Sequence, residues 1–203
     1  MTWSGAFDAL AHAIESLWSL RSTTASRTHA RDALAALVPV LRRAPWPPSP
    51  ADRATLSTAA TRAGLAIDAT RTTAGHAFAY PLTARFGVRH GLACAVNLVW
   101  LLPYTAHRLD ADCQDPRGTA FVARRLAQIA AGLGAAGPAD SGAALAALLA
   151  GTGFAADLAG HGVTRADLPG VVEAALGSGR SGNGPIRLDP TAILSALDYS
   201  PLP

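Results

Sequence analysis

The 203-residue sequence predicts an all-α fold, and three observations lead to that prediction. Apolar residues recur at helical spacing along most of the chain, as Leu10, Ile14 and Leu17 do near its start. No segment alternates apolar and polar residues with the β-branched and aromatic types that strands favour. Hydrophobic residues make up 50% and charged residues 15%, which is typical of a folded protein and argues against disorder. We therefore expect a single all-helical domain over residues 1–203.

The first part of the chain is predicted to form three helices. They cover residues 7–20, residues 29–43 and a segment that begins after Ser49 and continues to residue 73. A proline-rich linker at 45–50 separates the second from the third. Ser49 followed by proline is a common helix start, because serine caps free N–H groups and proline fits the first turn.

Proline and glycine punctuate the rest of the chain. Pro81 lacks an N–H donor, so we expect it to kink or end its helix. Asp189 is the predicted N-cap of the last helix, with Pro190 in its first turn. The segment 91–104 is the most apolar, but it is shorter than the ~20 apolar residues that span a bilayer, so a buried helix is expected. The remaining helices are predicted at 91–102, 118–133, 141–149, 168–176 and 190–197.

Charge and cysteine content exclude several classes of protein. The net charge is +3 and every basic residue is an arginine, but the arginines are scattered and no aromatic residues alternate with them. A nucleic-acid surface would need a concentrated basic stripe with stacking rings, so we expect no nucleic-acid and no membrane partner. Cys94 and Cys113 form no CxxC pair, and Cys94 lies in an apolar run as a small core residue would. No signal peptide is recognisable, and we expect a cytoplasmic protein.

Four side chains in two segments could bind one metal ion. Asp8 and His12 are four residues apart and project from one face of a helix. His76 lies on a predicted helix, and His90 precedes the next, where a turn can direct its ring toward His76. One carboxylate and three imidazoles suit divalent iron or zinc and leave positions for a substrate. Spacing alone fits equally a capping Asp8 with a buried, hydrogen-bonded His12, so the residues themselves leave both interpretations open.

Two further interpretations involve no dehydrogenase. A metal-dependent hydrolase would use a metal-bound water, with Glu15 as its general base, because Glu15 lies seven residues after Asp8 on roughly the same helix face. A non-catalytic remnant would hold at most a structural metal. A GxGxxG pattern at 132–137 follows a helical run instead of a strand, so we expect an interhelical turn and no nucleotide-binding loop.

Three short segments occur in an order and spacing that is more specific than any one of them. They read SGAFDALAHAIE at 4–15, GHAFAYPL at 75–82 and VRHGLA at 88–93, and a weaker fourth is GNGPIRLD at 182–189. Together they resemble the all-helical, metal-binding C-terminal domain of the iron-containing alcohol dehydrogenase family. The resemblance implies a metal site, usually of iron and alternatively of zinc, with four ligands: Asp8, His12, His76 and His90.

The same resemblance implies an activity and an incomplete active site. In the family, the metal holds the oxygen of a small aldehyde or alcohol while NAD(P)H transfers hydride. The family places an α/β nucleotide-binding domain before the helical one, and this sequence begins almost at the metal motif. We therefore expect NAD(P)H to be held by a domain not in this chain, in trans or in a longer reading frame. The isolated chain is expected to be inactive, and a homo-oligomer is compatible with the resemblance.

Within the family, the Trp-containing opening and the segment TRTTA at 70–74 resemble the branch that reduces phosphonoacetaldehyde. A phosphonate would need cationic partners, and arginine suits bidentate contact, which points to Arg71, Arg85 and Arg89 near the metal motif. The alternative is that these arginines face solvent. Tyr80 replaces a histidine credited with proton relay in many members, so Tyr80 either moves a proton or shapes the pocket.

Overall fold

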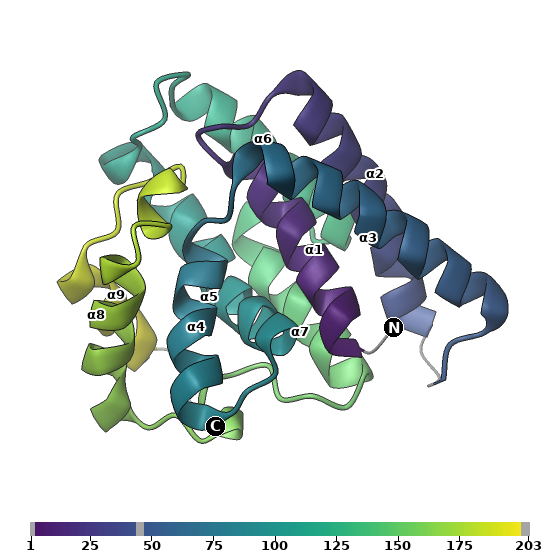
Figure 1. Cartoon of the computed structure of the whole chain (residues 1–203). Helices are drawn as coiled ribbons and strands as arrows, with labels where there is room; N and C mark the ends of the chain where they lie inside the picture. Colours follow the sequence, from purple (N-terminus) through teal and green to yellow (C-terminus); the bar gives the residue numbers. More distant parts are fainter. Residues whose placement is uncertain (1–2, 44–46, 200–203) are drawn as a thin grey trace.

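The computed structural model describes residues 3–43 and 47–199 and confirms the all-α prediction (Figure 1). Within these residues no β-strand occurs, and the extended pairing is one isolated antiparallel bridge between Cys113 and Ile186. Residues 45 and 46 of the predicted linker lie outside the described residues. The α-helices are α1 (Trp3–Trp18), α2 (Thr24–Arg43), α3 (Pro50–Thr70), α4 (Ala74–Phe86), α5 (His90–Asp112), α6 (Thr119–Leu133), α7 (Ser141–Gly151), α8 (Leu168–Gly177) and α9 (Pro190–Tyr199). Short 3-10 turns are η1 (Pro138–Asp140), η2 (Ala159–His161), η3 (Arg165–Asp167) and η4 (Ser181–Asn183).

Two prolines lie inside helices that continue past them, so Pro81 does not end its helix and the predicted helix end at residue 102 is wrong. Helix α4 continues five residues past Pro81, and α5 runs through Pro103 to Asp112 instead of ending at residue 102. A proline removes one backbone hydrogen bond from a helix interior. Pro81 is itself buried, and α4 packs along α5 and α8, so tertiary contacts hold the helix on both sides of it.

Other helix ends are set by polar side chains. Helix α2 starts five residues earlier than predicted, because Thr23 and Ser26 exchange two bonds at its start: the Thr23 N–H donates to Ser26 Oγ and the Ser26 N–H to Thr23 Oγ1. Helix α3 ends at Thr70 and not at residue 73. The predicted Asp189 cap of α9 is confirmed, since Asp189 Oδ1 accepts from the Ala192 N–H at 2.8 Å.

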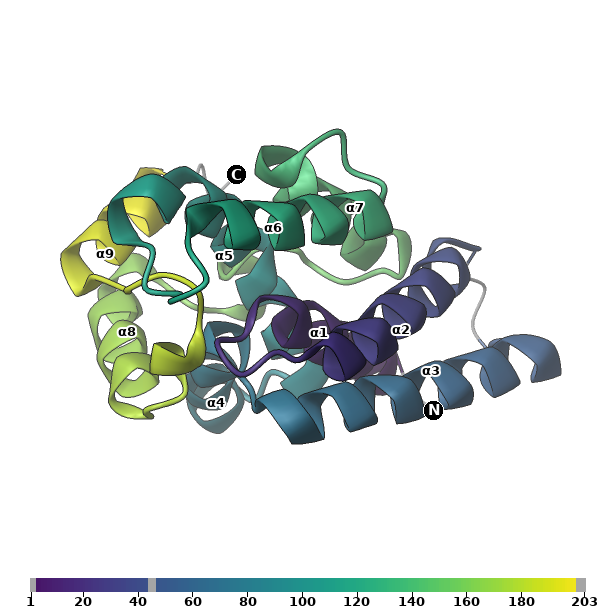
Figure 2. The ribbon, with the colours of Figure 1, turned by 90° about the horizontal axis from the view of Figure 1, so that it is seen from above.

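Helix α1 is the central element of the core. It contacts α2, α3 and α5, and the two views place α3 on one side of the molecule and the α8–α9 pair on the other (Figures 1 and 2). Burial on nearly all of its faces explains its apolar sequence. At Gly91 the start of α5 comes so close to α1 that a Cβ there would lie 1.9 Å from the carbonyl oxygen of Ser4. This approach brings the first turn of α5 beside Asp8.

The GxGxxG segment is an interhelical turn, as predicted. Helix α6 ends at Leu133, Gly134 adopts the left-handed conformation of a C-cap with φ of 71°, and η1 follows. Gly132 permits close packing of α6 on α2, since a Cβ there would lie 2.2 Å from the Leu34 side chain. Among the described helices, no single one is long and apolar enough to cross a membrane, although α6 and the η1–α7 segment, bent by 53°, would be by length and composition as a pair.

Candidate metal centre

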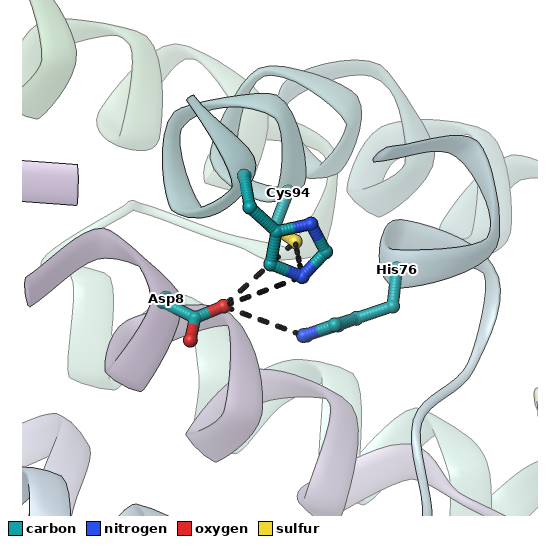
Figure 3. Close-up of side chains that lie close together, drawn as sticks. Asp8, His76 and Cys94 are labelled. Atoms are coloured by element: carbon teal, nitrogen blue, oxygen red, sulfur yellow. Dashed lines mark hydrogen bonds and ion pairs between the residues drawn. The ribbon is translucent and has the colours of Figure 1, made fainter. Parts of the chain in front are cut away.

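Three helices bring the four predicted ligand residues together. Asp8 comes from α1, His76 from α4 and His90 from the first turn of α5, and Figure 3 shows Asp8 and His76 directed toward one another. Asp8 Oδ1 is the common centre: it lies 3.5 Å from His76 Nε2, 3.9 Å from His90 Nε2 and 4.0 Å from His12 Nε2. Two of these nitrogens come from residues remote from Asp8 in sequence, so the cluster is a product of helix packing.

The three imidazole rings pack against one another around this carboxylate. The His12 and His76 rings are stacked, with centroids 4.7 Å apart and planes 8° apart. The His76 and His90 rings meet edge to face at 5.4 Å. His76 is almost fully buried, whereas Asp8, His12 and His90 are partly exposed. The cluster therefore has a closed side at His76 and an open side at His90.

Glu15 orients His76 from the buried side. Its Oε2 accepts a short hydrogen bond from His76 Nδ1, while its Oε1 accepts from the Thr73 hydroxyl at 2.6 Å and from the Thr73 and His76 N–H groups. Thr73 Oγ1 in turn accepts from Trp18 Nε1 at 2.9 Å. A carboxylate on Nδ1 places the proton there and turns Nε2 toward Asp8, as outer-shell carboxylates do for metal-binding histidines.

Burial and mutual contact shift the pKa values of this cluster. Burial raises the pKa of the Asp8 carboxyl, but the neighbouring His76 and His12 outweigh it, and the pKa lies below its ordinary value. Burial lowers the pKa of His12 and of His90 more than the Asp8 charge raises it. Burial lowers the pKa of His76, but the Glu15 and Asp8 carboxylates together outweigh it and hold that pKa far above normal. At neutral pH Asp8 is charged and His12 and His90 are neutral, the states in which these groups ligate metals. His76 is protonated in the metal-free chain and would release its Nε2 proton to a metal ion.

One side chain beside the cluster, Cys94, was expected from the sequence only as a core residue. Cys94, one turn after His90 on α5, is fully buried as expected, yet its Sγ lies 3.7 Å from His90 Nε2 and 4.0 Å from Asp8 Oδ1 (Figure 3). Burial raises the pKa of the Cys94 thiol to about 11. Asp8, His76, His90 and Cys94 each offer an atom within 4.8 Å of the others. The i,i+4 spacing of His90 and Cys94 was the available signal.

An open pocket of about 1100 Å³ adjoins the cluster through Tyr80. The Tyr80 ring lies 5.4 Å from the His90 ring, and it lines this pocket. Three arginines from separate segments also line it: Arg21, Arg71 and Arg180. Arg21 and Arg180 were not predicted from the sequence, because neither belongs to the segment around His76 and His90.

Of the three arginines proposed from the sequence to bind substrate, one lines this pocket. Arg71 does so, at the end of α3. Arg85 lies over the Phe86 ring and 3.8 Å from Asp167, on the side of α4 that faces α8. Arg89 is exposed at the N-cap of α5 and does not line the pocket. Proximity along the sequence placed all three near the motif, but it does not report which way the folded chain turns them.

The donor set fits a divalent metal ion. His76 Nε2 is buried and has no hydrogen-bond partner, which is costly for a polar nitrogen. It faces Asp8 Oδ1 together with two neutral imidazoles, a combination of oxygen and nitrogen donors that suits iron or zinc. The Tyr80 ring lies beside the His90 ring and also lines the pocket, so this side chain neighbours both the cluster and the pocket.

Comparison with known proteins assigns the family. Residues 2–199 match the model of the Fe-containing alcohol dehydrogenase family, C-terminal domain. The chain belongs to this family. The resemblance and the helical C-terminal fold inferred from the sequence are thereby confirmed.

The individual relatives of this iron-containing alcohol dehydrogenase domain are longer proteins. Phosphonoacetaldehyde reductase of Streptomyces viridochromogenes is 41% identical over 132 residues, which are 64% of this chain and 33% of that protein. The alcohol dehydrogenase from Oenococcus oeni superposes with a TM-score of 0.81 at 21% identity, over 96% of this chain and 50% of its own. Sulfoacetaldehyde reductase from Bifidobacterium kashiwanohense, solved in complex with NAD+, gives 0.78 at 24% identity, over 97% and 49%. The chain thus spans about half the length of these structures, and its matched part covers a third of the Streptomyces protein.

Proposed function

We propose that this chain is the metal-binding part of an NAD(P)H-dependent aldehyde reductase. The observation that carries the proposal is the unpartnered, buried Nε2 of His76, held 3.5 Å from Asp8 Oδ1 by the Glu15 contact on the other side of the ring. A metal ion would give this nitrogen its partner. The ion is iron, or alternatively zinc, and its ligands are Asp8, His12, His76 and His90.

When bound, the metal supplies Lewis acidity toward a carbonyl oxygen, and a reduced nicotinamide supplies the hydride. The chain's own residues hold and orient the reacting groups. Glu15 accepts the His76 Nδ1 proton, so that Nε2 is the ring nitrogen directed at the site and gives up its own proton when a metal binds. We assign Tyr80 the donation of the proton that the reduced oxygen takes up, from its Oη. Its place beside His90 supports this role, and its place on the pocket wall fits equally the alternative of shaping the pocket.

The nicotinamide needs a second structural unit. The relatives are about twice as long as this chain, and one of them was solved with NAD+. We propose that a nucleotide-binding domain outside these 203 residues, on the same or on another polypeptide, holds NAD(P)H across the pocket. Without it the chain is expected to bind metal but to reduce no aldehyde.

The proposed substrate is phosphonoacetaldehyde, with the product 2-hydroxyethylphosphonate. The 41% identity to a phosphonoacetaldehyde reductase and the arginines of the pocket support it. Among the arginines inferred from the sequence, Arg71 keeps its proposed contact with the phosphonate. Arg85 and Arg89 are not included, because they lie outside the pocket.

A hydrolase finds less support. Glu15, its intended general base, is fully buried, and both of its oxygens accept hydrogen bonds from Thr73 and His76. It lies behind His76 and not on the open side of the cluster. A carboxylate so engaged has neither access to a water nor a free lone pair directed at a substrate.

Metal analysis tests the proposal directly. The chain is reconstituted anaerobically with Fe²⁺ or Zn²⁺, freed of excess ion and measured by mass spectrometry of the elements. We expect a stoichiometric metal content in the wild type and its loss in His76→Ala. His107→Ala removes an exposed histidine from α5 and is the matched control. Equal metal content in wild type and His76→Ala would refute the site.

A further inference from the structure

We propose that Arg21, Arg71 and Arg180 form an anion clamp, and that Asn183 is the residue that positions it. The ligand is the dianionic phosphonate end of a short aldehyde. For the aldehyde, this inference rests on the proposed function. For the binding of the anion itself, it rests on the pocket alone.

The clamp collects positive charge from three distant segments into one cavity. Arg21 follows α1, Arg71 follows α3, and Arg180 precedes η4, yet all three line the same pocket. Asp68 is the one carboxylate among the lining residues, so the lining carries a formal excess of two positive charges. One guanidinium group can form two parallel hydrogen bonds to two oxygens of a phosphonate. Several guanidinium groups around one pocket therefore suit a dianion better than a neutral substrate.

The backbone of Arg71 is held in a conformation that side chains other than glycine rarely adopt. Its φ is +62° and its ψ is 163°, and it is the one non-glycine residue with positive φ in the described part of the chain. Such strain persists only where surrounding contacts enforce it, and it clusters at binding sites. Here it lies at a residue whose side chain lines the pocket.

Asn183 supplies the enforcing contacts. Its Nδ2 lies 2.8 Å from the Thr70 carbonyl oxygen, 3.1 Å from that of Thr72 and 3.4 Å from that of Arg71 itself. The carbonyls on both sides of the strained residue therefore turn toward one amide group. Because this amide can donate two hydrogen bonds, it fixes the path of the chain through Arg71.

The backbone of Asn183 also forms hydrogen bonds beside the two other arginines, Arg21 and Arg180. Its carbonyl oxygen accepts from the Leu20 N–H at 3.1 Å, next to Arg21, and its N–H donates to the Arg180 carbonyl oxygen at 3.0 Å. Asn183 thus forms hydrogen bonds with backbone groups at or next to all three arginines of the clamp. The Arg180 guanidinium in turn lies over the Tyr80 ring, with Cζ 4.7 Å from the centroid.

The order of groups across the site suits one kind of molecule. The arginines lie in the pocket, Tyr80 stands between the pocket and His90, and His90 belongs to the metal cluster. A substrate with a phosphonate at one end and a carbonyl at the other would place each end beside the groups that bind it. Pyrophosphate in a nicotinamide dinucleotide has similar chemistry, and the experiment must distinguish the two sources.

Calorimetric titration of the metal-free chain with ethylphosphonate, which has no carbonyl to reduce, tests the clamp. We expect wild type to bind it and to bind neither propan-1-ol nor ADP-ribose comparably. Arg71→Gln and Arg180→Gln should each raise the dissociation constant about 10- to 100-fold, as expected for a lost charge-assisted contact. Arg85→Gln makes the same change at an exposed arginine outside the pocket and should leave the constant unchanged. Binding of ADP-ribose alone, or equal effects in all three variants, would overturn the proposal.

A double-mutant cycle tests the positioning role of Asn183. We expect Asn183→Ala to weaken ethylphosphonate binding when Arg71 is present and to have no further effect in Arg71→Gln. A purely structural role would weaken both backgrounds alike and would overturn it. Arg71→Gly should raise the melting temperature while it weakens ethylphosphonate binding, because glycine relieves the strain.

The two proposals fail in different ways. A wild-type chain that binds metal but no ethylphosphonate refutes the clamp and leaves the metal site standing. A chain that binds ethylphosphonate but no metal refutes the reductase and leaves the clamp standing.

Discussion

Replacement of Glu15 by glutamine should weaken metal binding, although Glu15 is not itself a proposed ligand. In the wild type both carboxylate oxygens accept, Oε2 from His76 Nδ1 and Oε1 from Thr73 and the His76 backbone. A glutamine amide has one accepting oxygen and one donating nitrogen. If its NH₂ group faces His76, the imidazole proton moves to Nε2, the atom proposed to bind the metal. If its oxygen faces His76, its NH₂ group meets the donors of Thr73.

The magnitude follows from these contacts. A substitution in the outer shell of a metal site costs about 10- to 100-fold in metal affinity. In the metal-free protein, the loss of a charge-assisted hydrogen bond from a fully buried carboxylate should lower the free energy of unfolding by about 2–4 kcal/mol. The loss of metal affinity and the loss of stability both follow from replacing the Glu15 carboxylate by a neutral amide.

The sign of the pH dependence is set by the pKa shifts of the pair. Burial raises the pKa of Glu15, but the charge of His76 lowers it below 4.5, so its stabilisation is present above pH 4.5 and is lost as the pH falls. The His76 pKa is raised above 6.5, so its stabilisation is complete below pH 6.5 and is lost as the pH rises. The difference in unfolding free energy between metal-free wild type and Glu15→Gln should therefore be largest between pH 4.5 and 6.5.

Two assays check this prediction. Zn²⁺ affinity is measured by competition with a chelating dye, and unfolding by urea titration with circular dichroism after removal of metal. Glu173→Gln, at an exposed carboxylate on α8, is the control and should change neither quantity. A loss of Zn²⁺ affinity smaller than about threefold in Glu15→Gln, against the 10- to 100-fold expected, would refute the orienting role.

Three further changes test the fold and the site. Gly91→Ala should lower the free energy of unfolding by about 3 kcal/mol or more, because its Cβ would lie 1.9 Å from the Ser4 carbonyl oxygen. The control Gly64→Ala, at a position in α3 with open space around it, should raise the free energy of unfolding by about 0.5–1 kcal/mol. Similar urea midpoints for these two variants would contradict the packing at Gly91. Asp189→Ala should cost about 1 kcal/mol by loss of the α9 cap, and an unchanged urea midpoint would show that the cap is dispensable. Tyr80→Phe should lower kcat for the aldehyde about 100-fold in an enzyme completed by a nucleotide-binding domain if Oη donates the proton, whereas a change confined to KM would leave Tyr80 a pocket residue.

Much of the helical fold was predictable, because helix formation depends on neighbours three and four residues apart. The periodicity of Leu10, Ile14 and Leu17 located α1, and Asp189 marked the start of α9. The errors came where tertiary packing overrides a local rule. Pro81 and Pro103 lie inside helices that continue past them and pack on neighbouring elements, a contribution that no local pattern reports.

The candidate metal residues were also readable in the sequence, since Asp8 and His12 share a helix face and His76 and His90 belong to short motifs of the family. Only the tertiary structure brought them around one oxygen, and only it revealed Glu15 behind His76 and Cys94 beside His90. These contacts depend on how α1 crosses α4 and α5.

The division between sequence and structure is sharpest at the arginines. Proximity along the chain favoured Arg85 and Arg89, whereas the folded chain lines the pocket with Arg21 and Arg180 beside Arg71. Short-range spacing along the chain was enough to predict most of the helices and the types of donor atom. Which charges meet depends on the path of loops remote in sequence, and contacts such as those of Asn183 set that path.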